Sequence, residues 1–134
     1  VSSDFCRGLV ADDEADQSAT RAAFEVLRLI ASERLSAGRL TVVDATSVQP
    51  LGRLPLLGLA REHHVPAIAI VLRLPEDVCV ARRQGRPGRP VPPEVVRSQV
   101  RDLESSLPSL GDEGFENVYV LGTQKEIDRA MVAM

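Results

Sequence analysis

The residues of this sequence best suited to chemistry are two aspartates that follow β-type segments. Asp4 precedes Arg7 by three positions, and Asp44 closes the segment TVVD. A carboxylate at this spacing from an arginine can accept a proton from an attacking hydroxyl while the guanidinium holds a neighbouring phosphate. Asp44 has the form of a Walker B carboxylate, which holds a metal ion or its water beside a nucleotide phosphate. A surface salt bridge between Asp4 and Arg7, and a helix cap at Asp44, would give the same patterns.

A cluster of arginines is the second chemical feature. Arg82 and Arg86 lie one helical turn apart, and Arg89 follows in the segment GRPGRPVPP, where glycine and proline forbid helix and sheet alike. We expect residues 82–93 to form an arginine-rich lid, whose guanidinium groups would stabilise the charge of a transferring phosphoryl group. A solvated basic loop is the alternative interpretation.

One nucleotide-binding motif is absent from the 134 residues. The pattern GxxxxGK followed by Ser or Thr, whose backbone amides and lysine cradle nucleotide phosphates, occurs nowhere, and Lys125 is the only lysine. No degenerate copy of the motif can therefore be hidden elsewhere in the sequence. We expect little or no phosphoryl transfer from this chain by itself.

Short apolar runs and helical patterns alternate along the chain. Three runs rich in β-branched residues, at residues 40–43, 67–72 and 118–121, predict strands buried on both faces, and residues 1–4 look like the tail of a further strand. The predicted helices lie around residues 23–31, ending by Gly38, at about residues 50–64, 75–83 and 93–107, and after Thr123. Strands that alternate with helices imply a parallel sheet, in which ligands bind at the carboxyl ends of the strands.

Length and composition describe one globular domain over residues 1–134, because 44% of the residues are hydrophobic and the net charge is only −3. Such a charge gives no global electrostatic footprint for nucleic acid. Cys6 and Cys79 form no disulfide framework or zinc spacing, so we interpret both as small buried residues. The sequence has no apolar run that could span a bilayer and no signal segment, which predicts a cytoplasmic protein without membrane partners.

The opening segment SSDFCRGLV, residues 2–10, with the acidic DDE and DQ that follow it, resembles the kinase module of the bacterial polynucleotide kinase-phosphatase. The likeness continues through TVVDAT at residues 41–46, LPE at 74–76, the lid arginines and VYVL at 118–121. It covers essentially the whole chain. Members of that family are RNA-repair enzymes whose parent chains also carry a metallophosphoesterase and a ligase-like adenylyltransferase module.

The resemblance implies a three-layer α/β fold, a P-loop kinase-like parallel sheet flanked by helices, that uses ATP and Mg²⁺ to phosphorylate 5′-hydroxyl ends of RNA or DNA. It makes Asp4 the general base and Arg7 a ligand of the acceptor strand's phosphate. Asp44 would be the Walker B-type residue, with Mg²⁺ held through water. The residues that would bind the phosphates of ATP are Arg82, Arg86 and, as a helper, Arg89.

The family's first strand, P-loop and following helix have no counterpart in the sequence. Because that strand lies in the middle of the sheet in P-loop kinases of this type, its neighbours would keep unpaired backbone groups. A fragment of a longer protein, a rearranged domain, or a strand-swapped homo-oligomer would each explain this. Two other functions also fit the residues: a P-loop kinase for a small molecule, and a non-catalytic fragment that binds nucleic acid or assembles through strand edges.

Overall fold

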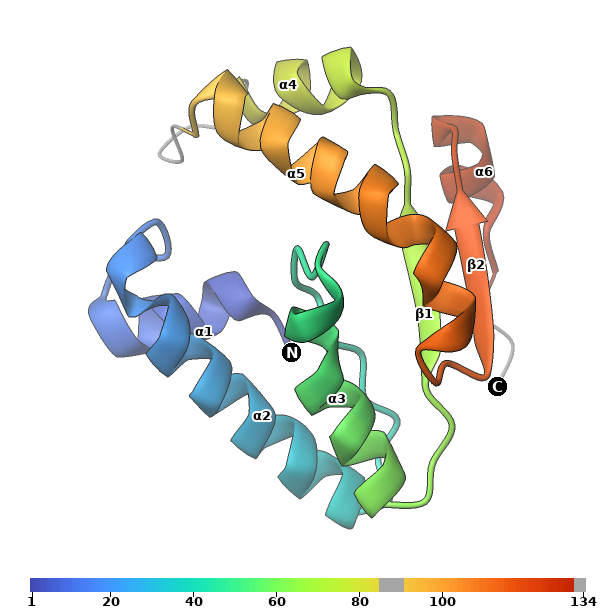
Figure 1. Ribbon diagram of the computed structural model, residues 1–134. Helices are drawn as coiled ribbons and strands as arrows, with labels where there is room; N and C mark the ends of the chain where they lie inside the picture. Colours follow the sequence, from blue (N-terminus) through green and yellow to red (C-terminus); the bar gives the residue numbers. More distant parts are fainter. Residues whose placement is uncertain (85–90, 132–134) are drawn as a thin grey trace. The chain divides into compact units, whose positions relative to one another are not determined.

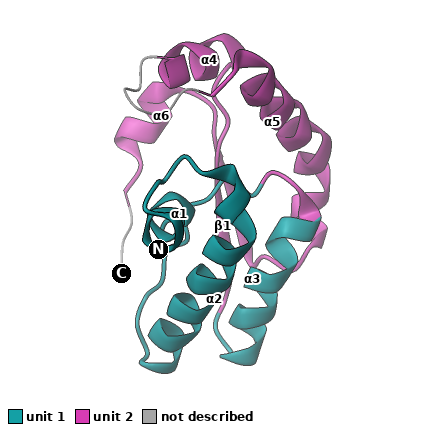
Figure 2. Ribbon diagram, turned by 90° about the vertical axis from the view of Figure 1, so that its left-hand side faces the viewer, with its two compact units in different colours: residues 1–47, 51–65 teal, residues 48–50, 66–134 magenta. Residues whose placement is uncertain are grey.

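The computed structural model describes residues 1–84 and 91–131, which fall into two compact units (Figure 2). The first unit holds Val1–Ser47 and Leu51–Val65, and the second holds Val48–Pro50 and the chain from Pro66 onward. The described residues make six α-helices and one parallel sheet of two strands, so the predicted α/β class is confirmed. No described helix has both the length and the apolar character needed to cross a membrane. That residues 1–134 form a single domain stays a prediction.

Three helices pack around a small core in the first unit. They are α1 (Ser3–Ala11), α2 (Thr20–Ser36) and α3 (Pro50–Glu62, in this unit from Leu51), and the short 3-10 segment η1 (Gln17–Ala19) leads into α2 (Figure 1). The buried centre consists of Cys6, Ala23 and Leu27. Since α1 and α2 supply that whole centre, apolar packing sets the position of α1.

The amino-terminal segment forms a helix where the sequence analysis predicts the tail of a strand. The Ser2 hydroxyl accepts a hydrogen bond from the N–H of Phe5 at 3.3 Å, which caps α1, and Asp4 lies in the first turn, where a negative charge is favourable. Asp12 ends the helix with a φ of 57°. The predicted strand tail over residues 1–4 is therefore wrong for Ser3 and Asp4, which are helical.

Residues 40–43 do not form the predicted strand. The chain there makes one parallel bridge, between Ser2 and Asp44, and Leu40 and Val42 are 61% and 67% exposed. In the part of the chain that the structure describes, the segment paired with it is the short stretch at Val1 and Ser2. A ladder needs several paired residues on both strands, so this short neighbour supports a single bridge.

The second unit is built on two parallel strands, β1 (Ile68–Leu72) and β2 (Asn117–Leu121), which pair from Ile68 with Asn117 to Leu72 with Leu121 (Figure 1). Between the strands the chain forms α4 (Glu76–Gln84), α5 (Pro93–Ser106) and the 3-10 segment η2 (Leu107–Asp112), and α6 (Gln124–Arg129) follows β2. Parallel strands require a crossover of this kind. The predicted parallel pairing of these two runs is therefore confirmed.

The prediction that these strands are buried on both faces is wrong. Ile68, Ile70 and Leu72 share one face of β1 and are each more than half exposed, whereas Ala69 and Val71 are partly buried. Because successive side chains of a strand point to opposite faces, this alternation is that of a strand packed on one side.

Candidate functional site

Asp4 and Arg7 are positioned by the burial of a residue between them. Cys6 is fully buried against Ala23 and Leu27 of α2, which fixes the rotation of α1 about its axis. Asp4 and Arg7 lie one helical turn apart, so both reach the same side of α1. Burial raises the pKa of the Cys6 thiol, which keeps the thiol protonated and unreactive. Cys6 is therefore the packing residue that the sequence predicts.

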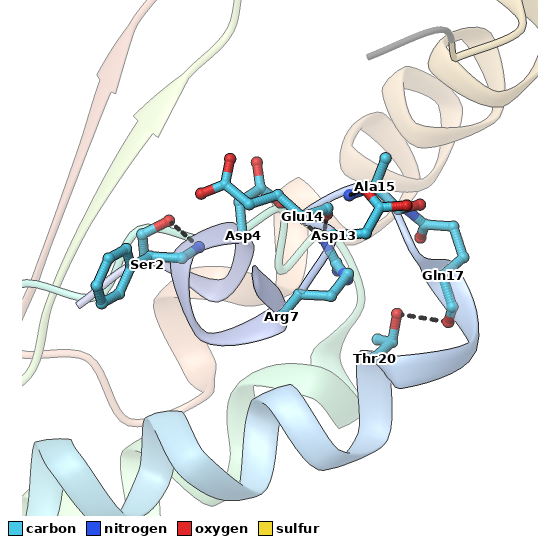
Figure 3. Close-up of polar contacts among 9 residues, drawn as sticks. Ser2, Asp4, Arg7, Asp13, Glu14, Ala15, Gln17 and Thr20 are labelled. Carbon is cyan, nitrogen blue, oxygen red and sulfur yellow. Dashed lines mark hydrogen bonds and ion pairs between the residues drawn. The ribbon is translucent and has the colours of Figure 1, made fainter. Parts of the chain in front are cut away.

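The Arg7 guanidinium is held between α1 and the loop that follows it. Its Nη1 donates to Oδ1 of Asp4 at 2.8 Å and to the backbone oxygen of Glu14 at 3.1 Å (Figure 3). The salt bridge between Asp4 and Arg7 that the sequence allows is therefore present, but with Arg7 only 7% exposed it is partly buried and not a surface pair. The Asp4 side chain keeps 34% of its surface exposed, and its carboxylate is therefore accessible to a substrate.

One donor of Arg7 lacks an acceptor. Within the described residues, Nε of Arg7 is buried and makes no hydrogen bond. A buried N–H without a partner is unfavourable by about 1–3 kcal/mol, and such groups are rare in proteins. The oxygens of an anion such as phosphate would satisfy a guanidinium of this kind. Arg7 thus carries a charge and an unsatisfied donor, and an anion would reach that buried donor only if the surrounding chain moved.

The acidic loop between α1 and α2 supplies the second acceptor of Arg7. Asp16 accepts hydrogen bonds from the hydroxyl and the backbone N–H of Ser18, which lower the pKa of Asp16 and begin η1. Asp16 therefore caps the 3-10 segment η1, whereas α2 itself begins at Thr20 after Ala19, which makes no capping hydrogen bond. A Cβ on Gly8 would lie 2.9 Å from Cγ of Glu14 but 3.9 Å from its backbone nitrogen, so a larger residue would displace the Glu14 side chain while keeping ordinary contact with the loop backbone.

Backbone hydrogen bonds join Asp44 to the residues at the start of α1. Its backbone N–H donates to the carbonyl oxygen of Val1 at 2.8 Å, and its own carbonyl oxygen accepts from the N–H of Ser3 at 3.0 Å. Asp44 is exposed, and the next helix, α3, begins only at Pro50. The alternative that Asp44 caps that helix is therefore wrong, because a cap residue directly precedes the first turn.

A buried arginine that the sequence hypothesis omits supports the loop after Asp44. Arg53 of α3 is 6% exposed, and its Nη1 donates to the carbonyl oxygen of Ser47 at 2.9 Å. Ser47 has a φ of 41°, a left-handed conformation that serine rarely adopts. The available signal was the arginine within the otherwise apolar helical segment LGRLPLLGLA. Arg53 therefore helps to shape the chain that follows a predicted site residue.

The only predicted lid arginine with a described position is Arg82, in the last turn of α4. Its Nη2 donates to Oε1 of Gln124 at 2.5 Å, and Gln124 is a residue that the sequence hypothesis also omits. Arg86 and Arg89 lie outside the described residues. The structure therefore brings Asp4, Arg7 and Asp44 together in the first unit and places Arg82 in the second.

A metal ion would have to share its ligands with a substrate at this site. Among the described residues, no group of three or more His, Cys, Asp or Glu side chains could hold a metal ion. Mg²⁺ is commonly bound by one or two carboxylates together with water and substrate phosphates. The exposed carboxylate of Asp44 fits that mode, and Mg²⁺ at Asp44 stays a prediction.

A family model described as the AAA domain matches residues 1–110, from the bridge at Ser2 through α5 and into η2. The chain belongs to this AAA domain family. The match confirms the coarser part of the predicted resemblance, a P-loop kinase-like domain of a nucleotide-binding family, and it suggests a nucleotide-dependent, kinase-like activity. No curated protein matches the chain. The acceptor of this AAA domain must therefore be argued from its own residues.

Proposed function

We propose that this AAA domain transfers the γ-phosphoryl group of ATP to 5′-hydroxyl ends of RNA or DNA, within a protein that also carries a phosphate-binding loop. The 134 residues hold no GxxxxGK motif, and P-loop kinases need that loop to cradle the nucleotide phosphates. The observation that carries the proposal is the pairing of the accessible Asp4 carboxylate with the buried guanidinium of Arg7.

Asp4 and Arg7 suit a hydroxyl that lies next to a phosphodiester. The Asp4 carboxylate would take the proton of the 5′-hydroxyl as that oxygen bonds to the γ-phosphorus, while the bond from the γ-phosphorus to the bridging oxygen breaks and ADP leaves. The Nε of Arg7 is buried and has no acceptor among the described residues, and a movement of the chain around Arg7 would bring it to a phosphate oxygen of the acceptor strand. A small substrate without a phosphate would leave this donor unused. We therefore favour a nucleic-acid end over a sugar or another small molecule.

On the nucleotide side, Arg82 would stabilise the charge of the transferring phosphoryl group, with Arg86 and Arg89 as further cations of the same segment. Asp44 would hold Mg²⁺ through a water molecule. When bound, Mg²⁺ neutralises charge on the β- and γ-phosphate oxygens. The backbone hydrogen bonds that join Asp44 to Val1 and Ser3 support this assignment, because they hold Asp44 next to the segment that carries Asp4, the proposed base.

The test of the proposal compares acceptors. A protein that joins this domain to a phosphate-binding loop is incubated with γ-labelled ATP and either a 5′-hydroxyl oligonucleotide or the corresponding nucleoside. We expect the oligonucleotide to be labelled, and the labelling to be lost in Arg7→Ala but kept in Arg21→Ala, whose side chain is 93% exposed. Preferential labelling of the nucleoside would make the domain a small-molecule kinase. Salt-sensitive binding of the oligonucleotide without any transfer would make it a binding module.

We also propose that the chain by itself forms homo-oligomers through strand pairing. Residues 40–43 are a run rich in β-branched residues that forms no ladder in the described part of the chain, and the one bridge there is made by the adjacent Asp44. Such a segment can pair its remaining backbone groups with another chain. Light scattering over a range of concentrations tests this, since a monomeric mass throughout would exclude it.

A further inference from the structure

We propose that Gln124 is a positioning residue for Arg82, and that Asp128 holds Gln124 in the orientation this requires. The inference rests on the proposed function, because that function assigns Arg82 to the phosphates of a nucleotide. All three residues belong to the second unit. Arg82 lies in the last turn of α4, and Gln124 and Asp128 lie on α6.

The hydrogen bonds on the two sides of Gln124 fix which way its amide points. Its Oε1 accepts from Nη2 of Arg82 at 2.5 Å, and its Nε2 donates to Oδ1 of Asp128 at 2.7 Å. The reverse orientation would set the amide N–H groups against the guanidinium donors and the amide oxygen against the carboxylate. Only one orientation of the amide therefore satisfies both neighbours, and Asp128 selects the one that presents an acceptor to Arg82.

The start of α6 gives Gln124 a fixed place at the end of β2. The Thr123 hydroxyl accepts from the N–H of Glu126 at 3.1 Å, and the Glu126 carboxylate accepts from the N–H of Gly122 at 3.4 Å. This reciprocal cap ties the first turn of α6 to the residue that follows β2. Gln124 is thus held at the carboxyl end of a parallel strand, the edge where ligands of such sheets bind.

Arg82 gains order from this contact without losing its capacity for phosphate. A free arginine side chain samples many rotamers, and binding an anion then requires that freedom to be lost. Gln124 uses one of the five N–H donors of the guanidinium, so two neighbouring donors are left for a bidentate phosphate contact. Gln124 therefore lowers the entropic cost of phosphate binding by Arg82.

The first experiment measures the positioning itself. Relaxation of the Nε of Arg82 is followed by ¹⁵N NMR in the whole chain, with Arg82→Lys used to assign the signal. We expect an ordered Nε in the wild type and in Asp128→Asn, which keeps an oxygen acceptor for Gln124. Gln124→Leu and Asp128→Ala should both mobilise the Nε. Equal order in all four proteins would overturn the inference and leave the proposed function untouched.

The second experiment measures the consequence for ATP affinity, in a protein that joins this domain to a phosphate-binding loop. At low ionic strength, Gln124→Leu and Asp128→Ala should each raise the dissociation constant of ATP about three- to tenfold, as expected for one hydrogen bond of ordinary strength. Asp128→Asn should leave it unchanged. In the Arg82→Ala background, Gln124→Leu should have no further effect, because a positioning residue acts only through the residue that it positions.

The two experiments separate the failure of the inference from that of the proposed function. If Arg82→Ala binds ATP as tightly as the wild type and as Arg83→Ala, a partly buried neighbour on α4, then Arg82 does not bind phosphate and that part of the proposed function fails. If Arg82→Ala weakens ATP binding but Gln124→Leu does not, Arg82 keeps its role and the positioning by Gln124 is excluded. Additive effects in the double variant would likewise exclude it.

Discussion

The backbone N–H of Ser3 donates to the carbonyl oxygen of Asp44 at 3.0 Å, and this bond joins the two segments that carry the predicted carboxylates. Ser3 directly precedes Asp4 and is itself 7% exposed. Breaking such a backbone hydrogen bond is unfavourable, so the segment that carries Asp4 stays next to Asp44. The proposed reaction has this requirement, because the base for the acceptor and the metal carboxylate must serve the same phosphoryl group.

Replacing Arg7 by alanine should weaken oligonucleotide binding and destabilise the first unit. The change removes the donor that Asp4 and the Glu14 carbonyl share, and losing the partner of such buried groups typically destabilises a fold by about 1–3 kcal/mol. Arg7→Lys keeps the charge but not the forked donors, so its stability and oligonucleotide affinity should lie between those of the wild type and of Arg7→Ala. Urea unfolding and fluorescence anisotropy with a 5′-hydroxyl oligonucleotide measure both effects.

Arg21→Ala is the matched control, because the ion pair of Arg21 with Glu25, at 3.6 Å, is exposed. It should leave both stability and affinity nearly unchanged. Equal oligonucleotide affinity of wild type and Arg7→Ala would remove Arg7 from the acceptor site.

Asp4→Asn should abolish most transfer while preserving the fold. Asparagine keeps an oxygen that can accept from Arg7, but it cannot take the proton of a hydroxyl, and the loss of a general base slows catalysis about 10²- to 10⁴-fold. The rate is measured in a protein that joins this domain to a phosphate-binding loop, with oligonucleotide affinity measured alongside. Asp13→Asn changes a nearby carboxylate that accepts from the N–H of Ala15, and it should transfer at the wild-type rate. An undiminished rate for Asp4→Asn would exclude Asp4 as the base.

The elements that the sequence predicts well are those whose signals are local. The helix opened by Thr123 is present because the Thr123 hydroxyl caps it, and the runs at residues 67–72 and 118–121 pair in parallel across a helical crossover. The contact of Asp4 with Arg7 also follows from spacing, since residues three apart on a helix are neighbours. The helix over Ser3–Ala11 was missed, although Ser2 in front of an acidic first turn is a cap signal.

The features that sequence patterns do not predict depend on distant parts of the chain. Residues 40–43 have the composition of a strand, but β-propensity reflects a fit to neighbouring strands, and the described chain makes one bridge, at the adjacent Asp44. The burial of Arg7 requires the loop with Glu14 to fold back on α1. Gln124 is notable only once α4 brings Arg82 to it. None of these contacts can be predicted from the spacing of residues within one local segment.

Gly8→Ala should loosen the loop that holds Arg7. The new Cβ would lie 2.9 Å from Cγ of Glu14, so the Glu14 side chain must move within the loop whose carbonyl oxygen accepts from Arg7. We expect a lower melting temperature and weaker oligonucleotide binding than in the wild type. Gly58→Ala is the control, because a Cβ there meets nothing within 4 Å, and alanine within a helix is favoured over glycine by about 0.5–1 kcal/mol. If both variants were stabilised, the close approach at Gly8 would be irrelevant.

The ion pair between Arg73 and Glu104 should give the second unit a pH-dependent share of its stability. Nε and Nη2 of Arg73 donate to the two carboxylate oxygens of Glu104 at 2.7 and 2.8 Å, which ties the residue after β1 to α5. The hydrogen bond from Arg73 lowers the pKa of Glu104 below its ordinary value of 4.5. A carboxyl whose pKa is lowered by folding stabilises the protein above its unfolded pKa, and this contribution is lost as the pH falls through the folded value.

Glu104→Gln should therefore unfold at a lower urea concentration than the wild type at pH 7, and the difference should shrink steadily as the pH falls below 4.5. Both side chains are nearly half exposed, so the difference should be small and should decrease with added salt. Glu25→Gln, which removes the acid of a more exposed pair with Arg21, is the control and should show little difference at any pH. A difference for Glu104→Gln that grows with acidity would contradict the assigned sign, because the wild-type carboxyl would then be stabilising in its protonated form.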